Sequence, residues 1–217
     1  KAKGIPYAKI ASRVMAGEKL SKFNLVSKTK KMFAVKEAVF PFNKFPNSDL
    51  LLGPEMKSTG EVMGFDKDFG MAFAKSQIAA SNSLPTKGLA FISLKDSHKP
   101  EGIDLAKQLL KLGFKLCATK GTAEFIRQNK IKCRTINKVS SGSPNIVDVL
   151  NSKKIALVIN TGGGSRKHRI SDAREIRRAT LNNKVPYCTN MSTAQACLEA
   201  INSLKNKKLE VTSLQDI

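Results

Sequence analysis

The sequence predicts an α/β fold: a mainly parallel sheet with helices on both faces, preceded by a mostly helical partial domain. From about residue 86 onward, short apolar strands alternate with helical patterns, which is typical of parallel sheets built from β-α-β units. Several of these strands end in loops that carry Lys, Thr, Asn or Gly. A polar turn cluster at 81–88 separates this regular part from a less regular one. We therefore expect two units, residues 1–85 and residues 86–217.

The first unit alternates poorly between strands and helices. Helical patterns cover 6–15 and about 66–80, and a strand is predicted at 33–40. In the second helix we expect Phe69, Phe73 and Ile78 to be buried. Because so few elements would bury a poor core alone, we interpret this unit as the end of a larger domain, and the chain as a piece of a longer protein.

The second unit has a regular order of elements. Its predicted strands are 89–94, 114–119, 132–136, 154–160 and 185–188, and its predicted helices are 100–113, 122–129, 145–151, 171–183 and 192–204. Ile103, Ala106 and Leu110 have helical spacing and mark the buried face of the first of these helices. Ser171 is expected to cap the fourth helix, which puts Asp172 in its first turn.

The chain of 217 residues carries a net charge of +21, which raises the question of a polyanionic partner. Its lysines are spread through the sequence, and it has two Tyr and no Trp that could stack on bases. We therefore expect no nucleic acid partner, although a basic polyanion-binding module stays an alternative.

Cysteine usage and hydropathy indicate the kind of compartment. Cys117, Cys133, Cys188 and Cys197 lie in apolar segments without C-x-x-C spacing, which is typical of reduced core residues and not of a zinc site. No apolar run approaches the roughly 20 residues of a transmembrane helix. We expect a cytoplasmic protein with no membrane partner.

The strongest functional signal is a glycine-rich loop after the strand at 154–160. Asn160 and Thr161 are followed by three glycines at 162–164 and then by a basic cluster. Backbone N–H groups of such a loop can point at a phosphate, and the cations add favourable charge. The alternative is an ordinary turn.

Similar residues follow other predicted strands. Thr119 and Thr122 flank a glycine after one strand, while Lys99 and Lys138 follow two others. Because the carboxyl ends of parallel strands meet at one edge of an open sheet, we expect these side chains to converge on a small phosphorylated ligand. An alternative role for Thr122 is to cap the helix that follows it.

Two long stretches resemble a known family. They are A-V-K-E-A-V-F-P-F-N-K-F-P at 34–46 and L-L-G-P-E-M-K-S-T-G-E-V-M-G at 51–64, and residues 5–17 match the segment upstream. They resemble the end of the second synthetic (ATP-grasp) half of the large subunit of glutamine-dependent carbamoyl phosphate synthetase (synthase). From about residue 86 the chain is similar to the allosteric domain of that family, which implies a methylglyoxal-synthase-like fold.

The resemblance implies that the parent protein is an ATP-dependent carbon–nitrogen ligase. It would make carbamoyl phosphate from bicarbonate, glutamine-derived ammonia and ATP, for arginine and pyrimidine biosynthesis. The implied cofactors of the full subunit are ATP and Mg²⁺, with K⁺ possible, and its implied partner is a glutamine amidotransferase small subunit within an oligomer. The family's metal and ATP-phosphate ligands lie upstream of the residue that matches Lys1. We therefore assign no catalytic residue, metal ligand or cofactor to this chain and expect it not to catalyse alone.

The resemblance also implies two regulatory sites. For the nucleoside monophosphate, UMP or IMP, the family's positions match Lys99, Thr119, Thr122, Lys138, Asn160, Thr161 and Asp172. For ornithine they match Glu37 and Thr189, and the alternative for Glu37 is an ion pair with Lys36 or another surface lysine. Gly162 is a departure, because bacterial relatives often carry a second Thr there, in a shorter loop. Backbone N–H groups could replace that hydroxyl.

A competing enzymatic interpretation is a methylglyoxal synthase-type lyase. That chemistry needs a carboxylate base beside the phosphate loop. The strand at 154–160 leads instead to Asn160 and Thr161, with no Asp or Glu before Asp172. His98 lies near the position of a histidine in that family, but without the base it is a weak signal. The sequence therefore favours a binding module.

Overall fold

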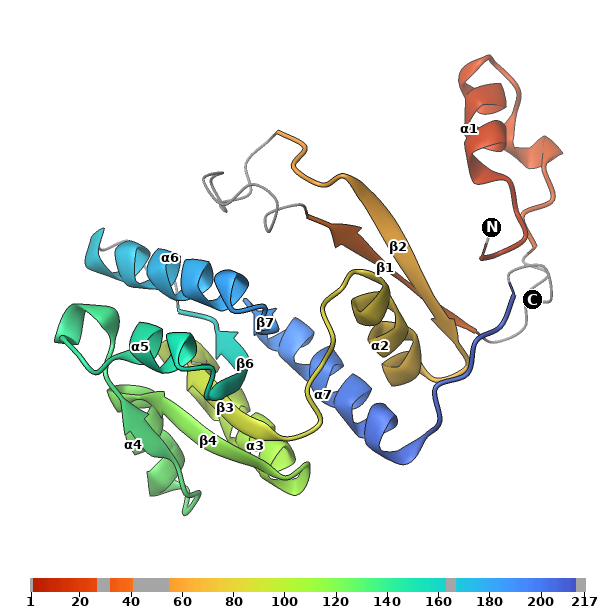
Figure 1. The fold of residues 1–217 in the computed structure, drawn as a ribbon. Coiled ribbons are helices and arrows are strands. Elements are labelled where there is room, and N and C mark those ends of the chain that lie inside the picture. The colour runs from red at the N-terminus through yellow and green to blue at the C-terminus, as the bar shows by residue number, and fades with distance from the viewer. Residues whose placement is uncertain (1, 27–31, 41–54, 163–166, 214–217) are drawn as a thin grey trace.

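The computed structural model in Figure 1 describes residues 2–26, 32–40, 55–162 and 167–213, with the backbone alone at 167–171. Its centre is a five-stranded sheet in the order β5-β4-β3-β6-β7. The strands are β3 (Gly88–Ser93), β4 (Phe114–Thr119), β5 (Arg134–Ile136), β6 (Ile155–Asn160) and β7 (Tyr187–Cys188). All neighbouring strands are parallel, so their carboxyl ends share one edge. The predicted α/β class is confirmed.

Helices cover both faces of the sheet. The core on one face includes residues of α3 (Lys99–Lys111), α4 (Lys120–Gln128) and α7 (Met191–Asn206). The core on the other face includes residues of α5 (Ile146–Asn151) and α6 (Lys167–Asn182). Right-handed crossovers require this distribution. From β3 through β4 to β5 the chain moves toward one edge of the sheet, and from β5 through β6 to β7 it moves toward the other, so the connecting helices lie on opposite faces. Two short 3-10 helices, η2 (Asp96–His98) and η3 (Val139–Ser141), follow β3 and β5.

The central strand shows why the apolar runs form strands. Ala90 and Ile92 belong to the core under α3 and α7, whereas Phe91 belongs to the core under α5 and α6. All three are fully buried. A strand in the middle of a parallel sheet is buried on both faces, so its sequence is a continuous apolar run instead of an alternating one.

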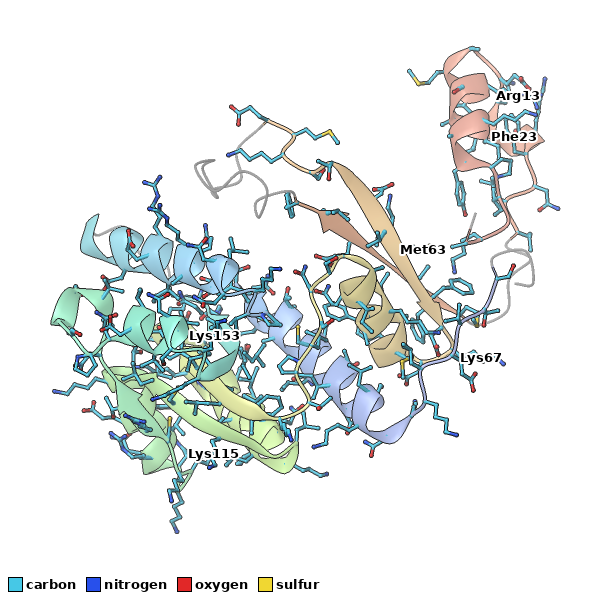
Figure 2. All side chains as sticks on the ribbon, viewed as in Figure 1. Arg13, Phe23, Met63, Lys67, Lys115 and Lys153 are labelled. Carbon is cyan, nitrogen blue, oxygen red and sulfur yellow. The ribbon has the colours of Figure 1, made fainter. Side chains whose placement is uncertain are left out.

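The residues before the sheet form a second group of elements. These are α1 (Tyr7–Met15), η1 (Leu20–Lys22), the antiparallel strands β1 (Phe33–Val39) and β2 (Gly60–Asp66), and α2 (Phe69–Ala79). Figure 1 shows α1 apart from the other elements, and none of its residues is buried. Arg13 of α1 makes a local contact: its guanidinium carbon lies 4.9 Å from the centre of the Phe23 ring (Figure 2).

α2 connects this group to the sheet domain. It contacts β1 and β2 and also α7. A Cβ built on Gly70 would lie 2.6 Å from the carbonyl oxygen of Glu199, so α2 and α7 approach within backbone contact. Phe73 of α2 lies in the same core as residues of β3, α3 and α7. The division of the chain at residues 85 and 86 stays a prediction, and the apolar core extends across it.

Four sequence expectations differ from the structure. Ile78 and Leu110 are 40% and 38% exposed, because each lies toward the solvent edge of its helix. β2 was not expected, and α2 therefore begins later, where Asp68 caps it by accepting a hydrogen bond from Met71 N at 2.9 Å. Ser171 is not an N-cap: α6 begins at Lys167 and Ser171 lies within it. Lys and Arg are good helix formers, which explains the earlier start in the basic cluster.

The cysteines are buried and carry free thiols, as predicted. Burial raises the pKa of Cys117 to about 12 and that of Cys133 to about 11. The sulfur atoms of Cys188 and Cys197 lie 3.4 Å apart in the core. Within the described part of the chain, no helix is long and apolar enough to span a membrane.

Candidate functional site

A pocket of about 420 Å³ lies at the carboxyl edge of the parallel sheet, and we call it the sheet-edge pocket. The ends of three strands supply Ser93 from β3, Thr119 from β4 and Asn160 from β6. β3 lies between β4 and β6, so the connections diverge at this point. Such a topological switch point is where open α/β sheets bind ligands, and the volume is within the roughly 300–1,000 Å³ of small-molecule sites.

The structure brings four of the seven residues predicted for a nucleotide into the wall of this pocket: Thr119, Lys138, Asn160 and Asp172. Lys99, Thr122 and Thr161 lie outside the wall, but each makes a polar contact with a residue of it. Thr119, Thr122, Asn160 and Thr161 are four of the eight buried polar side chains among the described residues. Buried polar groups are costly unless they are hydrogen-bonded, so this concentration marks a built polar site.

The first turn of α4 presents backbone N–H groups beside the pocket. Thr119 is its N-cap residue but makes no capping hydrogen bond with its side chain. Thr119 Oγ1 lies 3.4 Å from Thr122 Oγ1, which accepts a hydrogen bond from Leu94 N at 3.1 Å. The alternative that Thr122 caps the helix is therefore wrong, because Thr122 lies inside α4 and ties it to the end of β3. Uncapped N–H groups and the helix dipole favour an anion here.

Lys99 brings a cation to the same corner. It is the first residue of α3, its side chain is 20% exposed, and its Nζ lies 2.7 Å from Asp96 Oδ1. A Cβ built on Gly121, in the first turn of α4, would lie 3.6 Å from that Nζ. The ammonium group therefore lies beside the helix start. The neighbouring His98 has a buried Nδ1 with no hydrogen-bond partner among the described groups, but it is not part of the pocket wall.

Asp172 and Lys138 form the side of the pocket that faces α6. Both carboxylate oxygens of Asp172 accept hydrogen bonds from Ser140, one from the backbone N at 3.0 Å and one from Oγ at 2.7 Å. These bonds fasten α6 to η3, directly after Lys138. Asp172 lies in the second turn of α6 and not in the first, because the helix begins at Lys167.

Asn160 organises the loop that leaves β6. Its Oδ1 accepts a hydrogen bond from Gly162 N at 3.1 Å, and its Nδ2 donates to the Tyr187 hydroxyl at 3.1 Å. Thr161 N donates to the carbonyl of Ser93 at 2.9 Å, which holds the start of the loop against β3. A Cβ on Gly162 would lie 3.1 Å from Asn160 Oδ1, so glycine suits this tight turn. The rest of the glycine-rich loop, 163–166, lies outside the described residues.

Sequence reasoning missed several residues of the wall. Ser93, Lys95 and Asp96 follow from the end of β3, and Ile176 adds an apolar surface from α6. One sequence signal could have indicated them: Ser93 is a hydroxyl residue at the end of β3, as Thr119 is at the end of β4.

A second pocket, of about 590 Å³, lies where β1 and α2 meet α6, β7 and α7, and we call it the Glu37 pocket. Both residues predicted for ornithine line it: Glu37 from the middle of β1 and Thr189 from the turn between β7 and α7. The pocket therefore has walls from both predicted units of the chain.

The Glu37 carboxylate faces this pocket with a neutral partner. Gln77 Nε2 donates a hydrogen bond to Glu37 Oε2 at 2.9 Å. Burial raises the pKa of Glu37, and the Gln77 hydrogen bond offsets part of that effect. Lys36, the alternative ion-pair partner, points elsewhere, with its Nζ 2.7 Å from Glu61 Oε2. A half-buried carboxylate of this kind suits an ammonium group.

Two further residues of the Glu37 pocket were not predicted: Arg177 from α6 and Tyr187 from β7. The Arg177 guanidinium carbon lies 5.9 Å from the centre of the Tyr187 ring. Burial raises the pKa of Tyr187, against the opposing effects of Arg177 and of the Asn160 hydrogen bond. The pocket thus has a carboxylate and a guanidinium in its lining.

Comparisons with known proteins define the class first. Residues 101–189 match the MGS-like domain family, and this range includes β4, β5, β6 and β7 of the parallel sheet.

Over nearly its whole length the chain is a homologue of the carbamoyl phosphate synthase large chain, as its motifs predicted. It is 47% identical over 219 residues to that protein of Mesorhizobium japonicum, an alignment covering 98% of this chain and 19% of the relative. It is 45% identical over 236 residues to the large chain, C-terminal section, of Aquifex aeolicus, covering 99% of this chain and 44% of the relative. The corresponding section of Methanopyrus kandleri is 46% identical over 223 residues, with 100% and 41% covered.

The chain spans about a fifth of the full-length relative and less than half of each C-terminal section. Among solved structures, a methylglyoxal synthase from Elizabethkingia anophelis NUHP1 is similar over 53% of this chain and 79% of that one. Its TM-score is 0.41 and its sequence identity is 18%.

Proposed function

We propose that this chain is the regulatory C-terminal part of a carbamoyl phosphate synthase large chain and that the sheet-edge pocket binds a nucleoside monophosphate such as UMP or IMP. One observation carries the proposal. Thr119, Lys138, Asn160 and Asp172 come from four separate elements or loops, yet all line one pocket at the switch point of the sheet.

Each part of the pocket suits one part of such a ligand. The phosphate would lie at the first turn of α4, where N–H groups and the ammonium groups of Lys99 and Lys138 attract an anion. Asp172 would accept hydrogen bonds from ribose hydroxyls, since a carboxylate has acceptor capacity beyond its two bonds to Ser140. Ile176 offers apolar surface to a base.

The test is a calorimetric titration of the chain with UMP and with IMP. Lys138→Ala removes a charge-assisted hydrogen bond, worth roughly 1.5–3 kcal/mol, and should weaken binding by about tenfold to a hundredfold. Lys115→Ala is the matched control, because Lys115 is an exposed lysine near the opposite end of β4 (Figure 2). Equal affinity in the Lys138 variant and the wild type would remove Lys138 from the site.

A lyase function is the weaker alternative. The carboxylate that lines the pocket on α6, Asp172, is already bound by Ser140 through both oxygens, which makes it a poor candidate for a free base. We expect no methylglyoxal when the chain is mixed with dihydroxyacetone phosphate. Product formed at a rate that saturates with substrate would favour the lyase instead.

The Glu37 pocket is our candidate for ornithine. Glu37 would accept hydrogen bonds from an ammonium group, and Arg177 supplies the opposite charge that an amino-acid carboxylate needs. Thr189 adds a hydroxyl at the turn into α7. Because the walls come from both predicted units, a ligand here would contact both of them.

The activity of the parent protein is part of the proposal. It would be a cytoplasmic, ATP- and Mg²⁺-dependent ligase that makes carbamoyl phosphate and works with a glutamine amidotransferase small subunit. The relatives carry the name carbamoyl phosphate synthase large chain, and this chain matches less than half of each. We place the catalytic groups outside this chain and its regulatory groups within it.

A further inference from the structure

Tyr187 lines one pocket and is hydrogen-bonded to a residue that lines the other. Its side chain lines the Glu37 pocket, and its hydroxyl accepts a hydrogen bond from Asn160 Nδ2 at 3.1 Å. Asn160 in turn lines the sheet-edge pocket. One hydrogen bond therefore joins the walls of two cavities.

The sheet register explains why the side chain at position 187 has this reach. Tyr187 is paired with Val158 on the parallel strand β6. Asn160 is two residues further along β6, which puts it on the same face of the sheet, about 6–7 Å away along the strand. A tyrosine hydroxyl can cover that distance, whereas phenylalanine would end short of the amide.

The Asn160 amide is held at both ends. While Nδ2 binds the Tyr187 hydroxyl, Oδ1 holds Gly162 N at 3.1 Å and so fixes the first turn of the loop after β6. A shift of the tyrosine ring must therefore either break one of these bonds or move the turn. Gly162 is itself part of the sheet-edge pocket.

α6 reinforces the same connection. Asp172 and Ile176 face the sheet-edge pocket, while Arg177 and Leu181, further along the helix, face the Glu37 pocket. Arg177 also lies over the Tyr187 ring at 5.9 Å. A helix that forms a wall of both pockets moves as a unit, so a displacement at one pocket is carried to the other.

We propose that the Tyr187 hydroxyl couples the two pockets, so that occupancy of one changes the affinity of the other through the Tyr187–Asn160 hydrogen bond. Tyr187 acts here as a positioning residue, and the inference rests on the proposed function of the two pockets. Energetic coupling requires an element whose arrangement both ligands bias, and this hydrogen bond with its attached turn is such an element.

The experiment measures the coupling factor with two probes, UMP for the sheet-edge pocket and ornithine for the Glu37 pocket. UMP is titrated into the full chain with and without saturating ornithine, and ornithine with and without UMP. Linkage requires the same factor in both directions, typically about 5–150-fold. Tyr187→Phe keeps the ring, and its packing under Arg177, but removes the hydroxyl. We expect Tyr187→Phe to reduce the coupling factor by about 3- to 10-fold, toward a value of one. The affinity for UMP alone should change less.

A spectroscopic readout separates coupling from a general loss of structure. The chain has two tyrosines and no tryptophan. Tyr7 is 52% exposed on α1, outside both pockets, so Tyr7→Phe is the matched control and leaves Tyr187 as the sole tyrosine. In that variant UMP alone should change the tyrosine fluorescence, although the proposed UMP site contains no tyrosine.

The outcomes are distinct. If both probes bind the wild type and Tyr187→Phe keeps the full coupling factor, the inference is overturned and the proposed function stands. If both bind with a coupling factor of one, the inference is overturned as well. If neither probe binds the wild type, the proposed function fails and the inference fails with it. A factor reduced in Tyr187→Phe and unchanged in Tyr7→Phe supports it.

Discussion

At the scale of single residues, the two pockets rely on polar side chains that the fold has withdrawn from water. Thr119, Asn160 and Thr161 are buried and bonded, and Glu37 is half-buried against Gln77. The groups that hold them are neutral, such as Lys95 N, which donates to Thr161 Oγ1, and Gln77 Nε2, which donates to Glu37. Withdrawing a polar side chain from water has a stability cost, and at Glu37 that cost can be measured.

Replacing Glu37 by Gln should separate stability from binding. Burial raises the pKa of Glu37, so the stability associated with the neutral carboxyl is present below its ordinary pKa and is lost as pH rises through the raised value. Glu37→Gln keeps the acceptor for Gln77 without the charge. We expect the free variant to be at least as stable as the wild type at pH 7 by urea unfolding.

The same substitution should weaken ornithine binding by about tenfold to a hundredfold, because it removes a charge-assisted hydrogen bond. UMP affinity without ornithine should stay unchanged. Wild-type affinity should also fall as pH is lowered through the Glu37 pKa, while the variant shows no such dependence. Unaltered ornithine binding by calorimetry would place the ornithine site elsewhere.

At the scale of elements, the approach of α2 to α7 decides how the Glu37 pocket is assembled. Gly70 faces the backbone of α7. Gly64 of β2 faces α2 even more closely, since a Cβ there would clash with the Ala72 carbonyl oxygen and would lie 2.5 Å from Ser76 N. α2 is therefore packed by its backbone on two sides. Gln77 and Phe73, which line the pocket, keep their positions through this packing.

Gly70→Ala should destabilise the protein. The new methyl group would lie 2.6 Å from both the Glu199 carbonyl oxygen and Ser203 Oγ, so α2 must move away from α7. Overpacking of this kind costs about 1–3 kcal/mol, more than the gain from replacing a helical glycine. Gly121→Ala in α4 is the control, because its nearest neighbour would be Lys99 Nζ at 3.6 Å. Urea unfolding of both variants against the wild type measures the difference, and a neutral Gly70→Ala would contradict the close packing.

The elements of the sheet domain were predictable because each carries its own local signal. β4 has the predicted bounds, and β3, β6 and α3 differ by one or two residues. β2 was missed because its sequence, G-E-V-M-G-F-D, has little alternation, and its strand form depends on pairing with β1 across the intervening residues.

The polar residues of the sheet-edge pocket were found because they follow strands. Tyr187 was not, because its role depends on which residue of β6 it meets.

At the scale of the whole molecule, Asp68 joins the N-terminal elements to the last helix. It caps α2, accepts a hydrogen bond from Ser203 Oγ at 2.5 Å, and lies 2.7 Å from Lys207 Nζ. These partners, Lys207 first and then Ser203, lower the pKa of Asp68 to about 2. The charge on one side chain thus contributes to holding two parts of the chain together.

Acid should release this link. Because the pKa of Asp68 is depressed, its contribution is fully present above its ordinary pKa of about 4 and is lost as pH falls toward 2. Asp68→Asn keeps a good N-cap but removes the charge. Because the pair with Lys207 is partly exposed, we expect the free energy of unfolding to fall by about 1 kcal/mol at pH 7. Near pH 2 the variant and the wild type should differ little. Asp104→Asn, from the exposed pair with Lys107, is the control. A pH-independent difference in unfolding free energy would contradict this role.

The strand order β5-β4-β3-β6-β7 also constrains how the chain can fold as it leaves the ribosome. β3 can pair with β4 once residue 119 is made, but its other edge is covered only when β6, which ends at Asn160, has emerged. During that interval an apolar central strand has an open edge, which is the kind of surface that pairs with other chains. The same delay applies to both pockets, since Asn160 and Tyr187 are among the last residues to join. The two pockets are therefore completed only after most of the sheet domain has been synthesised.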